Sequence, residues 1–283
     1  MSAAPAAPPS ASAEAPARGP GSRPAAAAGF LRVLFARMGA LCLVELQKLR
    51  HDRTELYTRA IQPTLWLVIF GQTFTRLKAI PTGDLPYIDF LAPGVLAQSA
   101  LFISIFYGIQ IIWERDAGVL AKLLVTPTPR EALIAGKAFA AGIRAFSQVV
   151  FVLVLSAVLG VALTTNPLRL AAAAGAVWLA AAFFSCLSMS IAGIVLKRER
   201  LMGIGQAIMM PLFFASNALY PVDLMPGWLQ AISHVNPLSY EVDALRGLLL
   251  HTPAHLAADF GVLLGTAILG IVVAARLLDR LAR

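Results

Sequence analysis

The sequence has few charged residues for its length. Only 13% of its 283 residues are Asp, Glu, Lys or Arg, and 58% are hydrophobic, whereas soluble globular domains average about 25% charged residues. Its two cysteines do not indicate a disulfide framework, because Cys42 precedes the first apolar run and Cys186 lies inside another. This composition excludes an ordinary soluble domain and indicates a protein that crosses a membrane several times.

Motifs for nucleotide binding, metal binding and nucleophilic catalysis are also missing. The pair Gly136-Lys137 lacks the remaining residues of a phosphate-binding loop. His251 and His255 are four residues apart, but Pro253 lies between them and no further ligand is evident. We therefore expect no catalytic residue, metal or cofactor in this chain. The net charge of +8 does not indicate nucleic-acid binding, because basic residues of membrane proteins concentrate in cytoplasmic loops.

The first 56 residues divide into two segments of different composition. Residues 1–29 are rich in Ala, Pro and Ser and lack the continuous apolar core of a signal peptide, which predicts a disordered cytoplasmic tail. Residues 30–56 place apolar residues at helical spacing among Arg and Lys, which is typical of an amphipathic helix at the membrane interface. A cytoplasmic helix packed on a soluble partner is the alternative for this second segment.

Six apolar stretches follow in the remaining domain, residues 57–283. Each can hold the roughly 20 residues that a transmembrane helix needs; they cover 59–76, 91–113, 137–163, 168–196, 201–222 and 257–277. If the N-terminus is inside, 19 of the 23 Lys and Arg residues lie on the inner side. The positive-inside rule therefore predicts cytoplasmic termini. The sequence predicts an all-α polytopic membrane protein with six transmembrane helices.

A charged stretch, WERDAGVLAKLLVTPTPR (Trp113–Arg130), separates the second apolar run from the third. Asp116 can cap a helix that Pro127 would end, and four apolar residues share one face of this helix: Val119, Leu120, Leu123 and Leu124. About ten helical residues span only ~15 Å, too little to cross a bilayer. We expect a helix at about 114–127 that lies along the membrane surface and docks into something outside it.

Three basic residues follow at seven-residue spacing, so they share one helical face. They are Arg130, Lys137 and Arg144. This pattern is typical of side chains that reach lipid phosphates. Contact with an acidic surface of a cytoplasmic partner is the alternative.

The segment 223–250 is apolar but is interrupted by prolines, including Asn236-Pro237. Short helices that dip back into the outer leaflet or cap a pathway would explain this pattern, because irregular backbone is tolerated at membrane depth only under protein cover. The candidate residues of this outer re-entrant segment are Asn236, Pro237, Tyr240 and Arg246.

Neutral polar, aromatic and Met side chains mark one face of the second apolar stretch and one face of the fifth. Such faces suit a large, greasy substrate, because Met and Phe adapt to varied shapes, although interhelical packing is the alternative for any single residue. The interiors of the stretches lack Asp and Glu, which disfavours an ion-coupled transporter. The candidate path residues are Gln98, Phe102, Phe106, Gln206, Met209, Met210, Phe213, Phe214 and Asn217.

The chain resembles the permease subunit of ABC-2 type ABC exporters, particularly the group with daunorubicin-resistance permeases and nodulation lipo-oligosaccharide exporters. The resemblance covers about residues 30–280. It rests on Glu114-Arg115-Asp116-x-Gly118 with Leu123-Leu124 and Pro127, on Asn236-Pro237-Leu238-x-Tyr240 with Ala244-Leu245-Arg246, and on Pro63-x-Leu65-Trp66-Leu67 with Gly71. Asp116 stands where many relatives carry Glu, which keeps the charge.

The resemblance implies an assembly. In this family a coupling helix docks into a separate cytoplasmic ABC ATPase, here through Glu114, Arg115, Asp116, Gly118, Leu123 and Leu124. The segment 30–56 would be the connecting helix. Two permeases would pair, with the second and fifth spans lining the path, and two ATPase copies would use Mg-ATP.

The resemblance also implies a function and a location. The chain would be a permease of the bacterial inner membrane, in contact with membrane lipids, that exports amphipathic drug-like or lipid-linked molecules. A polysaccharide or lipo-oligosaccharide exporter is the alternative. A self-sufficient secondary transporter is a remote one.

Overall fold

The computed structural model describes Gly39, Gln47 and residues 53–78, 80–83, 85–125 and 130–281. These residues are almost entirely helical, with no strand among them. The predicted tail 1–29 lies outside the described residues, as does most of the predicted interfacial helix 30–56.

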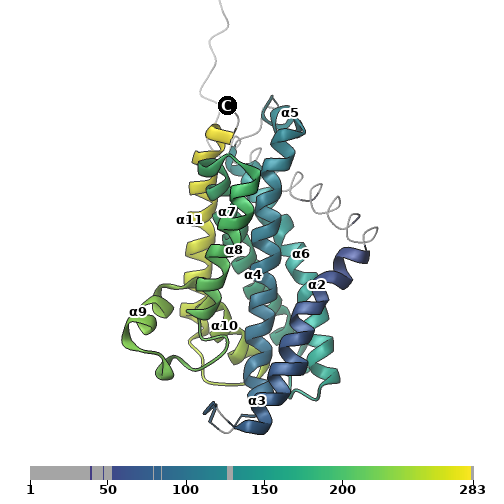
Figure 1. Cartoon of the computed structure of the whole chain (residues 1–283), viewed down its shortest axis with the longest axis vertical. Helices are drawn as coiled ribbons and strands as arrows, with labels where there is room; N and C mark the ends of the chain where they lie inside the picture. Colours follow the sequence, from purple (N-terminus) through teal and green to yellow (C-terminus); the bar gives the residue numbers. More distant parts are fainter. Residues whose placement is uncertain are drawn as a thin grey trace, which may run out of the picture.

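Four helices of the described chain are long and apolar enough to cross a membrane. They are α4 (Tyr87–Asp116), α6 (Arg130–Val158), α7 (Pro167–Val195) and α11 (Leu256–Leu281). At 1.5 Å per residue, the 30 residues of α4 extend about 45 Å, more than the hydrocarbon thickness of a bilayer. Figure 1 shows these helices running side by side along the long axis of the molecule. The predicted all-α, polytopic architecture is confirmed.

The other two predicted spans take a different form. The first is a continuous helical stretch in three parts, α2 (Arg53–Leu65), the π-helix η1 (Trp66–Gly71) and α3 (Gln72–Leu77). The second is α8 (Arg198–Phe214), which has 17 residues and ends before the predicted boundary at 222. Pro211 lies inside α8 and does not end it: one more helical turn follows Pro211 before the helix ends at Phe214.

Three short elements connect α8 to α11, and one connects α4 to α6. Between α8 and α11 lie the 3-10 turn η2 (Val222–Leu224), α9 (Gly227–Val235) and α10 (Pro237–Leu249). Between α4 and α6 lies α5 (Val119–Val125). In Figure 1, α5 lies at one end of the bundle, and α3, α9 and α10 lie toward the other.

Helix α7 lies at the centre and packs against α4, α6, α10 and α11. Small residues allow this close packing, as they do in other membrane bundles. A Cβ on Gly108 would lie 2.4 Å from the carbonyl oxygen of Ser185, and a Cβ on Gly142 would lie 2.1 Å from Nε1 of Trp178. Ser188 Oγ donates a hydrogen bond of 2.8 Å to the carbonyl of Ile105. These contacts fix α4 and α6 on α7.

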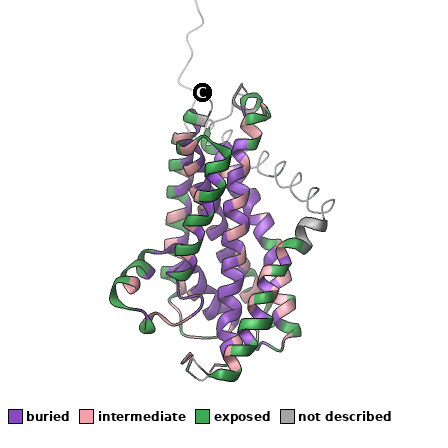
Figure 2. Cartoon of the chain, in the orientation of Figure 1, coloured by how far each residue is buried: buried purple, intermediate pink, exposed green. Residues whose placement is uncertain are grey.

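Burial follows this arrangement, as Figure 2 shows: the inward faces of the central helices are buried and the outer faces are exposed. The exposed faces of α6 and α11 carry large apolar residues, such as Val154 (59% exposed) and Leu269 (60% exposed). Such an exposed apolar surface is unfavourable in water and suits contact with lipid tails.

Candidate functional site

A glycine turn sets the geometry where α4 ends and α5 begins. Gly118 has φ +70°, and its N–H donates to the carbonyl of Arg115 at 2.9 Å. Residues with a Cβ rarely adopt this conformation, which explains why glycine follows the charged triplet. The turn ends α4 at Asp116 and sends the chain into α5, which has seven residues rather than the predicted ten or so.

Three charged residues, Glu114, Arg115 and Asp116, precede this turn, and their side chains bind mainly to other groups of the same chain. The Glu114 carboxylate forms an ion pair with the Lys137 ammonium of α6, and the Lys137 side chain is only 7% exposed. Arg115 bonds to Asp116 Oδ1 through Nε (3.0 Å) and Nη2 (2.8 Å), and to the carbonyl of Leu196 at 3.1 Å. Glu114 therefore ties the α4–α5 turn to α6, and Arg115 ties it to the turn between α7 and α8.

Asp116 keeps the most exposed side chain of the triplet, at 49% against 28% for Arg115 and 30% for Glu114. On α5, Leu120 is buried (1% exposed) whereas Val119 is 43% exposed. These two residues therefore do not share one buried face, although the predicted amphipathic helix placed them together. The side chains of Leu123 and Leu124 and the predicted terminator Pro127 lie outside the described residues.

Two of the three basic residues of α6 face the bundle, whereas Arg130, at the start of the helix, is exposed. Lys137 (5% exposed) and Arg144 (4% exposed) are buried, and the Arg144 guanidinium lies 5.0 Å from the centre of the Tyr107 ring of α4. The prediction that these residues reach lipid phosphates or a partner is wrong for both. Gln148, four residues after Arg144, is buried on the same face. Lys137, Arg144 and Gln148 form a buried polar stripe along α6.

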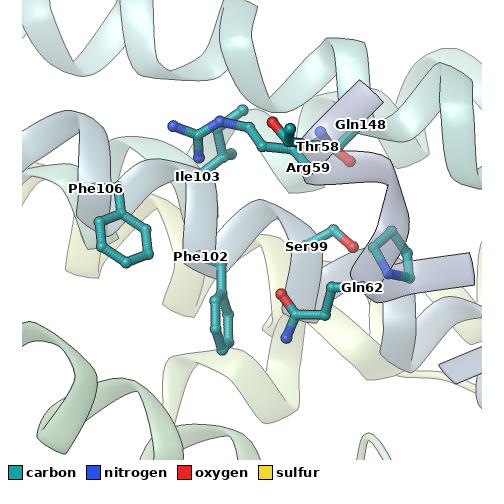
Figure 3. A pocket seen from close by; sticks show the side chains of 9 residues that line it. Thr58, Arg59, Gln62, Ser99, Phe102, Ile103, Phe106 and Gln148 are labelled. Atoms are coloured by element: carbon teal, nitrogen blue, oxygen red, sulfur yellow. The ribbon is translucent and has the colours of Figure 1, made fainter. Parts of the chain in front are cut away.

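The polar stripe leads from the α4–α5 turn to a pocket of about 380 Å³ between α2, α4 and α6. Figure 3 shows its lining: Thr58, Arg59, Gln62, Pro63, Ser99, Phe102, Ile103, Phe106 and Gln148. Phe102 and Phe106 are two of the predicted path residues. Sequence reasoning missed the contribution of α2 and α6, because it considered only the second and fifth apolar stretches.

The other predicted path residues lie elsewhere. Gln98, Met209, Phe213 and Asn217 are buried in the interior, and Gln206, Met210 and Phe214 are exposed on α8. Phe214 lines a separate groove of about 500 Å³ between α8 and α9, together with Tyr220 and Trp228. The structure therefore brings only Phe102 and Phe106 together in the α2/α4/α6 pocket.

At the other end of the bundle, the Asn236-Pro237 motif begins α10. Asn236 is the N-cap: its side-chain oxygen accepts from the N–H of Leu238 at 3.1 Å, while its amide donates to the carbonyl of Leu212 at 2.7 Å. Pro237 takes the first helical position, where its missing N–H is harmless. The Tyr240 hydroxyl donates to the carbonyl of His234 at 2.7 Å. The motif thereby fixes α10 to both α9 and α8.

At this end of the bundle, Arg246 of α10 contacts several other segments of the chain. It is 6% exposed, its Nη2 donates to the carbonyl of Asn217 at 2.6 Å, and it also bonds to the carbonyls of Phe90 and Ala218 at 3.3 Å. Its guanidinium lies 3.6 Å from the centre of the Phe90 ring. Burial lowers the pKa of Arg246 to about 9, so it remains a cation at neutral pH. This contact joins α10 to α4 and to the chain that follows α8.

Three acidic residues, Asp243, Asp89 and Asp259, also lie in this part of the chain, and none of them is in the interior of a predicted span. The Asn217 amide donates to Asp243 Oδ1 at 2.5 Å. Asp89 and Asp259, in the first turns of α4 and α11, are also buried. Asp89 and Asp259 lie at the ends of long helices, where the mean hydropathy of many apolar neighbours hides a single acidic residue.

Glu241 of α10 is completely buried, and neither of its carboxylate oxygens has a hydrogen-bond partner within the described chain. This burial raises the pKa of Glu241 well above its usual value. A protonated carboxyl is therefore the form that fits this position.

A bundle of long apolar helices with charged residues at its turns is the architecture of a polytopic membrane protein. The chain belongs to the ABC-2 type transporter family, whose model matches residues 37–250. It is the permease component of an ABC transporter, and in this family the ATPase is a separate subunit.

Three relatives illustrate the range of the family. The chain is 30% identical over 226 residues to the transport permease ycf38 of Cyanophora paradoxa, covering 79% of this chain and 76% of the relative. It is 25% identical over 200 residues to the daunorubicin resistance ABC transporter permease protein DrrB1 of Streptomyces coeruleorubidus, covering 71% and 70%. It is 26% identical over 197 residues to nodulation protein J of Rhizobium meliloti, covering 69% and 74%.

Proposed function

We propose that this chain is the membrane subunit of an ATP-driven exporter of amphipathic, drug-like or lipid-linked molecules. Two copies pair and bind two copies of a separate ATPase, in a bacterial inner membrane with both termini in the cytoplasm. The relatives support export, because their names include a drug-resistance permease and a nodulation protein. The distribution of Lys and Arg supports the orientation.

The observation that carries this proposal is the connection between the α4–α5 turn and the pocket. Asp116 is half exposed at that turn, where an ATPase could bind it, and Glu114 and Arg115 fasten the same turn to α6 and to the α7–α8 turn. The polar stripe of α6 then continues to Gln148 in the pocket. A partner that pushes on the turn would therefore act on the pocket.

The test has two stages. Native mass spectrometry of the protein, extracted gently from its host membrane, is expected to find two permeases with two ATPase subunits. In that complex, Asp116→Lys is expected to lower substrate-stimulated ATP hydrolysis and transport severalfold while membrane insertion stays normal. Asp223→Lys, an exposed charge reversal in η2, is the matched control. A permease without any ATPase, or full transport by the Asp116→Lys variant, would count against the proposal.

The second candidate function is export of a polysaccharide or lipo-oligosaccharide. It is favoured by the polar groups of the α2/α4/α6 pocket, among them Gln62, Ser99 and Gln148. Transport assays on the purified complex with lipid-linked glycans and with apolar drugs would separate the two candidates.

A further inference from the structure

The end of the bundle that carries α10 (Figure 1) contains another cavity, of about 540 Å³. Three parts of the chain line it: the start of α7, the last turn of α10, and the segment that leads from α10 into α11. Some of the lining residues are exposed, among them Leu168 (77% exposed) and His251. The α7/α10/α11 cavity is therefore open to the surroundings of the protein without any movement of the helices.

Contacts of the backbone hold the walls of this cavity together. The N–H of Thr164, just before α7, donates to the carbonyl of Leu249 at the end of α10 at 2.9 Å. A Cβ on Gly247 of α10 would lie 2.5 Å from the Cβ of Ala254, so glycine allows the segment before α11 to pack closely on α10. The three lining segments are therefore placed by the fold itself.

The polar side chains of the lining are all hydrogen-bond donors. They belong to Arg169, His251 and Thr252. Arg169 forms no hydrogen bond or ion pair with the described residues, and none of the described residues that line the cavity is acidic. Asp259, in the first turn of α11, is buried and does not line the cavity. A guanidinium, an imidazole and a hydroxyl around one cavity suit an oxyanion, above all a phosphate.

The helix ends at the cavity favour an anion as well. A helix N-terminus carries about +0.5 elementary charge and a C-terminus about −0.5. Two helices, α7 and α11, begin at the cavity, whereas only α10 ends there. The carbonyl of Leu249 in that last turn is already bonded to the N–H of Thr164. The backbone therefore adds net positive charge to that of Arg169.

The position of the cavity along α7 indicates where the phosphate comes from. The 29 residues of α7 extend about 44 Å, against about 30 Å of hydrocarbon, so the first turn of α7 reaches the level of the lipid headgroups. At the rim, the exposed Leu168 lies next to Arg169 in the chain. A lipid can contact Leu168 with an acyl chain and Arg169 with its phosphate, whereas a soluble anion can make only the second contact.

We propose that the α7/α10/α11 cavity binds the phosphate group of a membrane lipid, with Arg169, His251 and Thr252 as the donors. A lipid bound in this way joins the start of α7 to the segment before α11. The inference goes beyond the proposed function, because it depends neither on the molecule that is transported nor on the ATPase.

Photo-crosslinking of the full chain in maltoside detergent tests the site. Two lipids carry the same diazirine-labelled acyl chain: phosphatidylglycerol, which has the phosphate, and diacylglycerol, which lacks it. Mass spectrometry of the labelled fragments is expected to place phosphatidylglycerol near Leu168 and Pro253, at the mouth of the cavity. Labelling there by diacylglycerol is expected to be about tenfold weaker.

Four variants connect the labelling to the donors. Arg169→Gln is expected to weaken phosphatidylglycerol labelling at least about tenfold, the loss of one hydrogen bond to a charged group. Arg169→Lys keeps the charge and should recover part of this loss, and diacylglycerol labelling should not change in either variant. Arg76→Gln, the same substitution at an exposed position of α3, is the matched control and should label like the unaltered chain. If Arg169→Gln fails to fold, His251→Gln is the second test.

The outcomes also separate a lipid from a free phosphate. Soluble glycerol phosphate, added at the same concentration as the lipid, is expected to leave the labelling unchanged. Its complete displacement of phosphatidylglycerol would assign the cavity to a soluble phosphate and overturn the lipid site. Equal labelling by the two lipids, or unchanged labelling in Arg169→Gln and His251→Gln, would overturn the phosphate site altogether, whatever the result of the Asp116→Lys transport test.

Discussion

The ion pair between Glu114 and Lys137 allows a charge-exchange experiment. Glu114→Lys or Lys137→Glu alone places two like charges together, whereas the double variant restores an ion pair with its direction reversed. If the pair holds the α4–α5 turn on α6, each single variant should be destabilised and the double variant should recover most of the loss. Glu131→Lys, an exposed reversal in the first turn of α6, is the control and should change stability by less than about 0.5 kcal/mol.

The magnitude follows from the burial of the two side chains. Breaking a fully buried ion pair costs about 3–5 kcal/mol, because the remaining charge is left uncompensated. The Lys137 side chain is 7% exposed but that of Glu114 is 30% exposed, so solvent screening reduces the expected loss to about 2–3 kcal/mol for each single variant. A double-mutant cycle on thermal or denaturant unfolding in nanodiscs measures the coupling between them.

Transport by the complex with its ATPase is the second measurement. The double variant is expected to regain coupling together with stability, because the Glu114 carboxylate acts within the chain. Recovery of stability without recovery of transport would mean that the ATPase binds the Glu114 carboxylate directly. Additive losses, with no recovery of either property, would refute the assignment of the pair as the link between the turn and α6.

Four further substitutions have defined outcomes. Gly118→Ala should weaken transport and destabilise the chain by about 1 kcal/mol, measured by thermal unfolding, because φ is +70° there. Gly94→Ala should destabilise by at least about 1–3 kcal/mol in the same assay, since its Cβ would lie 2.2 Å from the carbonyl oxygen of Ala218; unchanged unfolding would contradict this packing. Arg246→Met should expose α9 and α10 to limited proteolysis, because three main-chain carbonyls lose their donor. The raised pKa of Glu241 means that the folded chain holds a proton that the unfolded chain releases above about pH 4.5; stability should therefore fall as pH rises from that value, and Glu241→Gln should abolish this part of the dependence.

The long helices could be predicted from the sequence because each is a long apolar run with charge at its ends. The predicted 91–113 and 168–196 lie within or nearly within α4 and α7. The fifth predicted span, 201–222, extends beyond the end of α8 because hydropathy cannot distinguish a helix from the apolar turn that follows Phe214. The π-helix at Trp66–Gly71 has no signature that separates it from an α-helix of the same composition.

The site was less predictable, because its residues meet through contacts distant in sequence. The seven-residue spacing of Lys137 and Arg144 correctly placed them on one face, but the spacing cannot say whether that face meets lipid or α4. Arg246 was selected from its motif, yet its partner carbonyl on Phe90 lies 156 residues earlier. Gln148 carried no local signal, since one glutamine in an apolar helix is also typical of interhelical packing.

The polar stripe of α6 has a mechanical consequence. Lys137 and Gln148 lie eleven residues apart on one helix that contains no proline, so their Cα atoms are separated by about 16 Å of rigid rod. A shift or rotation of α6 imposed at Lys137 therefore reaches Gln148 at once, without any relay of side-chain rearrangements between them. The delay between a movement at Lys137 and the response at Gln148 is then set by how fast the whole helix moves. Substitutions on the lipid-exposed face that make the helix more flexible should lengthen this delay.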